Sequence, residues 1–425
     1  MKVLFVSLSL PPFAESQTIR SAYMIEALAQ RGVQFDLLTA EVVPSQADET
    51  LLELMPKGVR FWRTASPAYD LHFQQIKARG SRLALYLYSN LAYRLYVPDI
   101  RRGWDTLAVS LAEQIRNEVK PDLLLSASGS CTAHLACATL KKRWDIPWIA
   151  DFGDPWSWVD WQHPDTWLKA IANSRLERST LPLVDHLVVT TESTAEAYRH
   201  WFGRSCPPVQ VVPFGYRSVD FPNLMVAQAE LPITISYVGS ASRRARNLIP
   251  LIRALAPQST HPLSYRLQIV GSTSHHFLSE AQCVGLEHLE STGRISYSLS
   301  LKYIRSAGIL ALVGNRSPYQ VPGKTFLYLA SGRPVLYLAQ MPKDQDPTYA
   351  LLKSFAGVRW VPNEESAISE FLGKLSLEAF REWEHQANLH PESTSLREYE
   401  ISRLTKPLVE QMSKLGTQSH VVSRG

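Results

Sequence analysis

The loop after the first predicted strand lacks glycine: none occurs between Ser7 and Arg31. A dinucleotide-binding fingerprint needs glycines there, for a tight turn and for close approach of the backbone to a pyrophosphate. The sequence also has no Gly-x4-Gly-Lys-Ser/Thr loop, no His-Glu-x-x-His segment and no Gly-x-Ser-x-Gly segment. These absences argue against a nicotinamide dehydrogenase, a P-loop nucleoside triphosphatase, a zinc protease and an α/β-hydrolase.

Cysteine is scarce, with four residues in a chain of 425, at Cys131, Cys137, Cys206 and Cys283. No two of them have the spacing of a zinc or redox motif, so we expect reduced and mostly structural thiols. Since metal-binding and dinucleotide-binding motifs are also missing, we expect no metal site and no cofactor. Reduced thiols are typical of a cytoplasmic protein. The opening apolar run ends at Pro11, too early for a membrane span, and no signal-peptide cleavage pattern follows it.

Charge of one sign is also limited, because 44 basic and 39 acidic residues leave a net charge of +5. This mild excess suits an anionic small ligand or an anionic membrane surface. A nucleic-acid-binding protein would carry a denser basic stripe, so no nucleic-acid partner is expected.

Apolar strands and amphipathic helices alternate along most of the chain. Val3–Leu10 is nearly all apolar, as in strands buried on both faces of a parallel sheet. Ile19–Arg31 has apolar residues at helical spacing and is closed by Gly32. The alternation lapses over 216–230 and resumes with a new apolar strand at Ile233. The sequence therefore predicts an α/β protein of two Rossmann-like, doubly wound parallel-sheet domains facing a cleft.

Three stretches follow one another in a characteristic order: PWIADFGDPW at 147–156, VVPFGYRSVDF at 211–221 and VPGKTFLYLASGRPVL at 321–336. With ITISYVGSASRRARN at 233–247, they resemble the motifs of glycosyltransferase family 4, which has the GT-B fold. The resemblance implies transfer of a sugar from a nucleotide-sugar donor to a saccharide or lipid-linked acceptor, with retention of anomeric configuration, in surface polysaccharide or glycolipid synthesis. It also implies that lysine and arginine take the place of a metal.

The resemblance and the lapse in the pattern together suggest a division of the chain. We expect residues 1–220 to form an acceptor-side Rossmann-like domain and 221–385 to form the nucleotide-sugar-binding domain. Residues 386–415 should form a C-terminal helix that returns to the first domain, followed by a tail at 416–425.

The expected donor site begins with Lys324, at the start of a predicted helix. A cation beside the positive end of a helix dipole is unfavourable unless an anion is near, although a solvent-exposed lysine is the alternative. Arg243 and Arg246 follow Gly239 in a basic loop, and the resemblance implies that a cation here, best matched by Arg246, contacts the donor phosphates. A solvated loop is the alternative, and Gly239 would permit close approach to the ligand.

One departure from the family pattern concerns its Glu-x7-Glu pair, whose positions here hold Tyr319 and Leu327. Since the second glutamate of the family grips the nucleotide ribose, its loss leaves Ser317, Tyr319 or Tyr328 as substitutes. The loss also keeps two alternatives open. One is a GT-B-fold pseudoenzyme that binds a nucleotide or a partner without catalysis, and the other is a nucleotide-sugar epimerase.

The expected acceptor side lies in DFGDPW, where a strand end would deliver Asp151 and Asp154 to a ligand. We expect Asp154 to act as a base or an orienting group, with a turn cap before Pro155 as the alternative. Trp156 and Trp158 are expected to border the acceptor, or else to pin the loop by packing.

The stretch 79–102 mixes several arginines with many leucines and tyrosines. A basic amphipathic surface of this kind can dock on anionic lipid, which predicts peripheral contact with the inner face of the membrane. The alternative is a pair of helices packed on the core.

Overall fold

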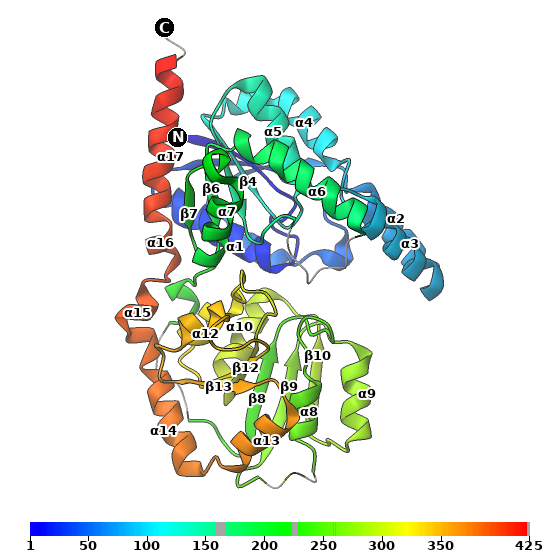
Figure 1. Cartoon of the computed structure of the whole chain (residues 1–425), viewed down its shortest axis with the longest axis vertical. Helices are drawn as coiled ribbons and strands as arrows, with labels where there is room; N and C mark the ends of the chain where they lie inside the picture. The colour runs from blue at the N-terminus through cyan, green and yellow to red at the C-terminus, as the bar shows by residue number, and fades with distance from the viewer. Residues whose placement is uncertain (158–165, 223–227, 258, 260, 423–425) are drawn as a thin grey trace. The chain divides into compact units, whose positions relative to one another are not determined.

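The computed structural model describes residues 1–157, 166–222, 228–257, 259 and 261–422 (Figure 1). Contacts between Cα atoms divide the chain into two compact units. Unit 1 comprises Met1–Pro213 and the C-terminal residues from Leu404, and unit 2 comprises Phe214–Arg403. The division after Pro213 lies seven residues before the boundary expected from sequence at residue 220.

Unit 1 is built on a seven-stranded sheet of order β3-β2-β1-β4-β5-β6-β7, in which every pairing is parallel. Its strands are β1 (Lys2–Val6), β2 (Gln34–Ala40), β3 (Arg60–Thr64), β4 (Leu123–Ala127), β5 (Trp148–Phe152), β6 (His186–Val189) and β7 (Val209–Val211). The chain adds strands on one side of β1, then returns to the other side, which is the doubly wound topology predicted from sequence.

The helices of unit 1 are α1 (Ser16–Ala29), α2 (Ala68–Ala78), α3 (Arg82–Leu95), α4 (Trp104–Val119), α5 (Thr132–Trp144), α6 (Trp167–Thr180), α7 (Glu192–Phe202) and α17 (Lys406–Val422). Short 3-10 turns lie at Pro44–Gln46, Glu49–Leu54, Leu181–Leu183 and Gly203–Ser205. The stretch 79–102, for which a pair of packed helices was the alternative to a membrane surface, includes α3, and α3 follows α2 directly.

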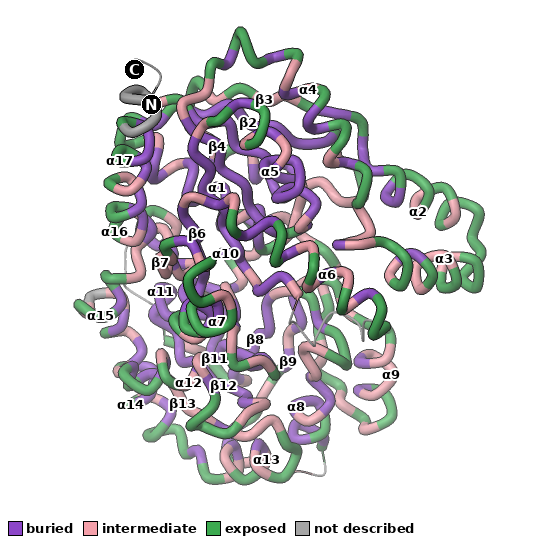
Figure 2. Tube along the Cα trace, turned by 45° about the horizontal axis from the view of Figure 1, so that its top comes forward, coloured by how far each residue is buried: buried purple, intermediate pink, exposed green. Residues whose placement is uncertain are grey.

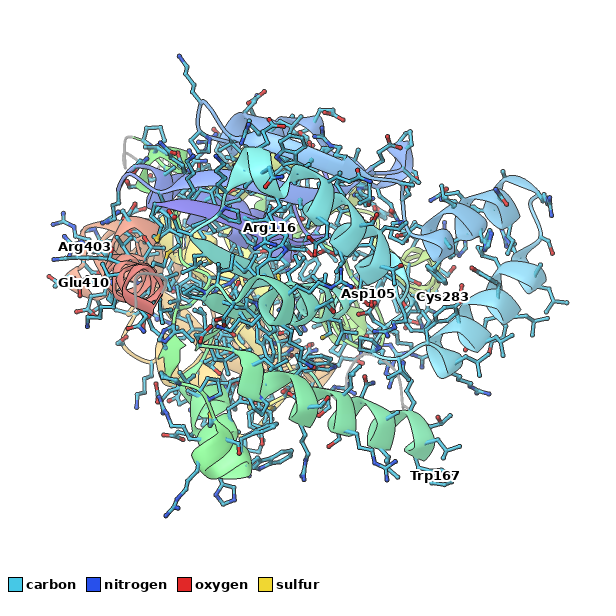
Figure 3. All side chains as sticks on the ribbon, turned by 90° about the horizontal axis from the view of Figure 1, so that it is seen from above. Asp105, Arg116, Trp167, Cys283, Arg403 and Glu410 are labelled. Carbon is cyan, nitrogen blue, oxygen red and sulfur yellow. The ribbon has the colours of Figure 1, made fainter. Side chains whose placement is uncertain are left out.

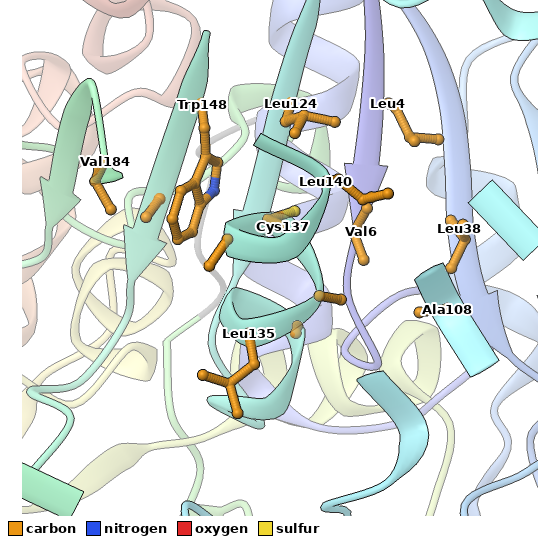
Figure 4. Close-up of a cluster of buried hydrophobic side chains, with 14 of the residues drawn as sticks. Leu4, Val6, Leu38, Ala108, Leu124, Leu135, Cys137, Leu140, Trp148 and Val184 are labelled. Carbon is orange, nitrogen blue, oxygen red and sulfur yellow. The ribbon is translucent and has the colours of Figure 1, made fainter. Parts of the chain in front are cut away.

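The core of unit 1 explains why its central strands read as continuous apolar runs. Every residue of β4 and β5 is buried, because helices cover both faces of the sheet. Figure 4 shows Cys137 and Leu140 of α5 packed beside Trp148 and Leu124. Full burial of one large apolar side chain stabilises the fold by about 1.5–3 kcal/mol.

Unit 2 repeats the architecture with a six-stranded parallel sheet of order β10-β9-β8-β11-β12-β13. Its strands are β8 (Ile233–Val238), β9 (Tyr265–Val270), β10 (Leu289–Gly293), β11 (Ile309–Val313), β12 (Val335–Ala339) and β13 (Val358–Pro362). Its helices are α8 (Ile249–Ala254), α9 (His275–Cys283), α10 (Tyr297–Ser306), α11 (Lys324–Ala330), α12 (Pro347–Leu352), α13 (Glu365–Gly373), α14 (Leu377–Asn388) and α15 (Thr394–Arg397), with 3-10 turns at Ser218–Asp220 and His390–Glu392.

The last part of the chain is not the single helix that the sequence predicts over 386–415. It forms the end of α14, the 3-10 turn at His390–Glu392, α15, α16 (Ile401–Leu404) and α17. Between α15 and α16 the backbone pairs with Tyr216 instead of continuing a helix: Tyr216 N donates to Tyr399 O, and Ile401 N donates to Tyr216 O. None of the helices in the described residues is long and apolar enough to cross a membrane.

Candidate functional site

The carboxyl end of β8 is the topological switch point of unit 2. Strand order runs away from β8 in both directions, through β9 on one side and β11 on the other. Ligands of doubly wound sheets bind outside the carboxyl ends of the strands at such a point. Gly239 follows β8 directly, and Gly314 follows β11.

Lys324, the first residue of α11, reaches this switch point. Its Nζ donates a hydrogen bond to Val238 O at 2.7 Å and lies 3.8 Å from the centre of the Tyr237 ring. Gly239 has a φ of +128°, and a Cβ there would come within 2.9 Å of the Lys324 Nζ. The lysine and the glycine therefore depend on each other, because any side chain at 239 would displace the ammonium group.

Arg246 brings a second cation to the same end of the sheet. Its Nη1 donates to Ala245 O at 3.0 Å and lies 3.5 Å from Gly314 O, just beyond β11. The loop that carries it is closed by a hydrogen bond from Arg246 N to Ser242 O at 2.8 Å. Arg243, in the same loop, is exposed.

Burial and the nearby Arg246 both affect the charge of Lys324. Burial lowers the pKa of Lys324 well below that of an ordinary lysine, and the positive charge of Arg246 lowers it further. Within the described residues, no carboxylate forms an ion pair with Lys324. A bound anion would offset both effects, because it would stabilise the protonated form of the lysine.

The remaining donor-site residues lie on or near α11. Tyr328 is fully buried, and its hydroxyl accepts a hydrogen bond from Val238 N at 2.9 Å, so it supports the end of β8. Leu327 is 9% exposed, three residues after Lys324 and therefore on the same side of the helix. Tyr319 is half-buried in the loop before α11, where its N donates to Ser317 Oγ at 3.3 Å.

In unit 1, Asp151 is engaged in a buried network at the end of β5. Arg20 Nη2 donates to Asp151 Oδ1 at 2.7 Å, and Arg20 Nε donates to Oδ2 at 3.0 Å. Gln17 Nε2 donates to the same Oδ2 at 3.1 Å. Since Arg20 and Asp151 are both 0% exposed, the carboxylate is held as a partner of the guanidinium, which favours a structural role over catalysis.

The other expected acceptor residues fall in different environments. Asp154 is half-buried, two residues beyond β5. Trp156 is 7% exposed and packs edge-on against Phe152, with 6.0 Å between ring centroids. This burial leaves the indole little surface for a ligand and favours the packing role. Trp158 lies outside the described residues.

Sequence reasoning missed a cluster at the switch point of the first sheet, between β1 and β4. Ser9 Oγ donates a hydrogen bond to Glu15 Oε1, and a Cβ on Gly129 would meet both side chains. Burial raises the pKa of Glu15 above its usual value, although Arg101 opposes this effect. The sequence signal for this cluster is Glu15 itself, a carboxylate in the loop after the first strand.

His134 is buried in the first turn of α5, and both ring nitrogens have partners. Nδ1 lies 2.8 Å from Ser126 Oγ and Nε2 lies 3.0 Å from Ser128 Oγ. Burial lowers its pKa to about 3, so the ring is neutral and serves the core.

The N-terminal half of the chain matches a known protein family. Residues 17–215 match the family model described as "Glycosyl transferase 4-like domain". No curated protein matches the chain in a sequence comparison.

Solved structures match over nearly the whole chain. Sucrose-phosphate synthase from Thermosynechococcus elongatus is 16% identical, with 99% of each chain covered and a TM-score of 0.68. Anabaena Alr3699/HepE in complex with UDP and glucose is 10% identical, covering 97% of this chain and all of the other, with a TM-score of 0.65. UDP-GlcNAc 2-epimerase from Neisseria meningitidis bound to UDP-GlcNAc is 16% identical, with coverage of 97% and 100% and a TM-score of 0.57. At these identities the likeness establishes a common fold.

Proposed function

We propose that this chain, a glycosyltransferase 4-like protein with the GT-B fold, binds the diphosphate of a nucleotide sugar at Lys324 and Arg246 and transfers the sugar to a saccharide or lipid-linked acceptor. The observation that carries the proposal is the meeting of two cations at the ends of β8 and β11. The HepE structure contains UDP and the epimerase structure contains UDP-GlcNAc, which supports a nucleotide-sugar donor.

The chemistry proposed for unit 2 is stabilisation of a leaving group. As the bond from the sugar to the diphosphate breaks, negative charge grows on the departing phosphate oxygens. Lys324 and Arg246 are fixed by backbone carbonyls of the sheet end, so they need little rearrangement to receive that charge. The family resemblance adds retention of anomeric configuration to the proposal.

The acceptor-side chemistry is proposed for unit 1, with Asp154 as the group that orients the acceptor hydroxyl. Glu15 is a second candidate, because a carboxyl group with a raised pKa can exchange a proton closer to neutral pH. Arg20 and Asp151 position the loop that carries Asp154 and do not take part in the reaction. All four cysteines are free thiols, which supports a cytoplasmic location for the enzyme.

The function can be tested by screening nucleotides and nucleotide sugars for thermal stabilisation, followed by transfer assays with the donor that binds. A ligand at a hundred times its dissociation constant should stabilise the protein by about 2.7 kcal/mol. We expect the sugar to be released from the donor only when an acceptor is present. Conversion of the donor to an isomer without an acceptor would instead identify an epimerase. Tight donor binding with no turnover across a broad acceptor panel would identify a pseudoenzyme.

A second test concerns the ribose. Replacing Leu327 by glutamate should tighten donor binding, because a carboxylate on the Lys324 side of α11 can accept hydrogen bonds from both ribose hydroxyls. Affinity for the donor would be measured by calorimetry at matched salt for wild type and Leu327→Glu. The matched control is Leu327→Gln, because glutamine has nearly the same size as glutamate but no charge. A folded Leu327→Glu protein that binds the donor no better than Leu327→Gln would mean that the ribose does not lie over this position.

A further inference from the structure

Helix α3 turns large apolar side chains toward solvent. Leu83, Leu87, Leu91 and Leu95 follow one another at four-residue intervals, with exposed fractions of 69%, 57%, 58% and 66%. Tyr86, at the edge of this row, is 65% exposed. Figure 2 shows the run of exposed residues along this helix, which projects with α2 from the rest of unit 1. A surface helix normally directs its apolar stripe to the core, so this arrangement calls for a covering partner.

The opposite side of α3 already has its own contacts. The Tyr88 ring stacks on Tyr69 of α2, with 5.4 Å between ring centroids, and Ala92 is buried. Tyr93 meets the same Tyr69 ring edge-on at 6.5 Å. The inner side of α3 therefore packs on unit 1, which leaves the leucine row as a second apolar face with no covering among the described residues.

The start of α6 adds to this apolar surface. Trp167, Leu168 and Ile171 are 71%, 61% and 43% exposed, and Figure 3 shows Trp167 at the outer end of the helix. Lys169, between them, donates from Nζ to Tyr93 O of α3 at 2.6 Å. That hydrogen bond fixes the beginning of α6 beside α3. We call the exposed residues of both helices the apolar apron: Leu83, Tyr86, Leu87, Leu91, Leu95, Trp167, Leu168 and Ile171.

Cations border the apron. Lys77, Arg79, Arg82 and Arg94 are exposed, and none of them pairs with a carboxylate of the described residues. The sequence has no aspartate or glutamate between Asp70 and Asp99. Apolar side chains edged by arginine, with an aromatic residue at the end of a helix, are the composition of helices that lie in a membrane interface.

We propose that the apolar apron docks on an anionic lipid surface, with α3 lying in the plane of the interface. Charge decides between this partner and a second copy of the chain. A two-fold contact places the same patch against itself, which would bring the unpaired cations of both copies together. Anionic lipid head groups would neutralise those cations while the leucines enter the acyl boundary. The inference rests on the proposed function in one respect: a lipid-linked acceptor would be bound at this membrane surface.

The experiment is co-sedimentation of the full chain with vesicles of phosphatidylglycerol and phosphatidylcholine, compared with phosphatidylcholine alone. Wild type should bind the anionic vesicles, and binding should weaken as salt is raised. Leu87→Glu/Leu91→Glu should reduce the partition coefficient by about a hundredfold or more, because two large apolar contacts are lost. The matched control is Leu389→Glu, because Leu389 is 55% exposed but lies in unit 2, outside the apolar apron. This control variant should bind vesicles as wild type does.

Arg79→Gln/Arg82→Gln tests the charge separately and should remove the preference for anionic lipid. Circular dichroism and calorimetric nucleotide binding of each variant establish that the protein is folded. Vesicle binding can be scored even if no nucleotide binds, so this proposal and the proposed function fail independently. Absence of vesicle binding would overturn the proposal. The proposal would also be overturned if Leu87→Glu/Leu91→Glu bound vesicles as tightly as wild type. A wild-type dimer in solution that this variant converts to a monomer would overturn it as well.

Discussion

Replacing Lys324 by methionine should weaken the binding of a nucleoside diphosphate about ten- to a hundredfold. The lost contact is a hydrogen bond from a charged group, which contributes roughly 1.5–3 kcal/mol. Methionine retains an unbranched apolar stem of similar length, so contact with the Tyr237 ring should largely persist and the fold should be kept. Isothermal titration calorimetry on both proteins measures the difference.

The control for this substitution is Arg243→Met, which removes a cation from the same region of unit 2 at an exposed position. Loss of long-range charge alone would weaken binding equally in both variants. A specific site requires a large effect at 324 and a small one at 243. Equal affinities for wild type and Lys324→Met would place the phosphates elsewhere.

The pH dependence of nucleotide binding gives the same site a second signature. Burial and Arg246 lower the pKa of Lys324 in the free protein. Binding favours the protonated amine, so affinity should be constant below that pKa and should fall as pH rises through it. The fall should therefore begin below about pH 10, where an ordinary lysine would still be charged. Lys324→Met should lack this part of the pH profile.

Replacing Asp151 by alanine should destabilise unit 1 by about 3–5 kcal/mol, because the Arg20 guanidinium would remain buried without its counter-charge. Urea unfolding, with hydrogen exchange of peptides from β4 and β5 to identify the unit, measures the loss. Glu196→Ala is the matched control. It removes an exposed acidic side chain from α7 of the same unit and should change stability little.

A double variant separates charge burial from loss of packing. Arg20→Met/Asp151→Leu removes both charges and fills the space with apolar atoms, so it should recover most of the stability lost in Asp151→Ala. If Asp151→Ala unfolds at the same urea concentration as Glu196→Ala, the pair contributes nothing to unit 1. A double variant no more stable than Asp151→Ala would instead assign the loss to the remaining hydrogen bonds of the network, from Gln17 Nε2 to Asp151 and from Arg20 Nη1 to Pro213 O.

The sequence alone determined the fold class and most of the central strands, because strands buried on both faces must be continuously apolar. The strand expected to deliver Asp151 from the PWIADFGDPW stretch is present as β5, Trp148–Phe152. The edge strands β3 and β10 were missed, since RFWRT and LESTG carry partly exposed, polar residues and no apolar run. These strands form by pairing with β2 and β9, and a local sequence pattern does not predict that pairing.

For the candidate site, the sequence singled out Lys324, Arg246 and Gly239 through helix position, charge and glycine. Only the tertiary structure decided that Arg246 lowers the pKa of Lys324, because the strands that precede these residues, β8 and β11, are neighbours in the sheet but distant in the chain. It also decided that Asp151 is matched by Arg20, a residue 131 positions away. The leucines of α3 were visible in the sequence as apolar residues. Which side of that helix is covered depends on Tyr69 and Lys169, which reach it from other helices, and so the exposed row could be recognised only in the folded chain.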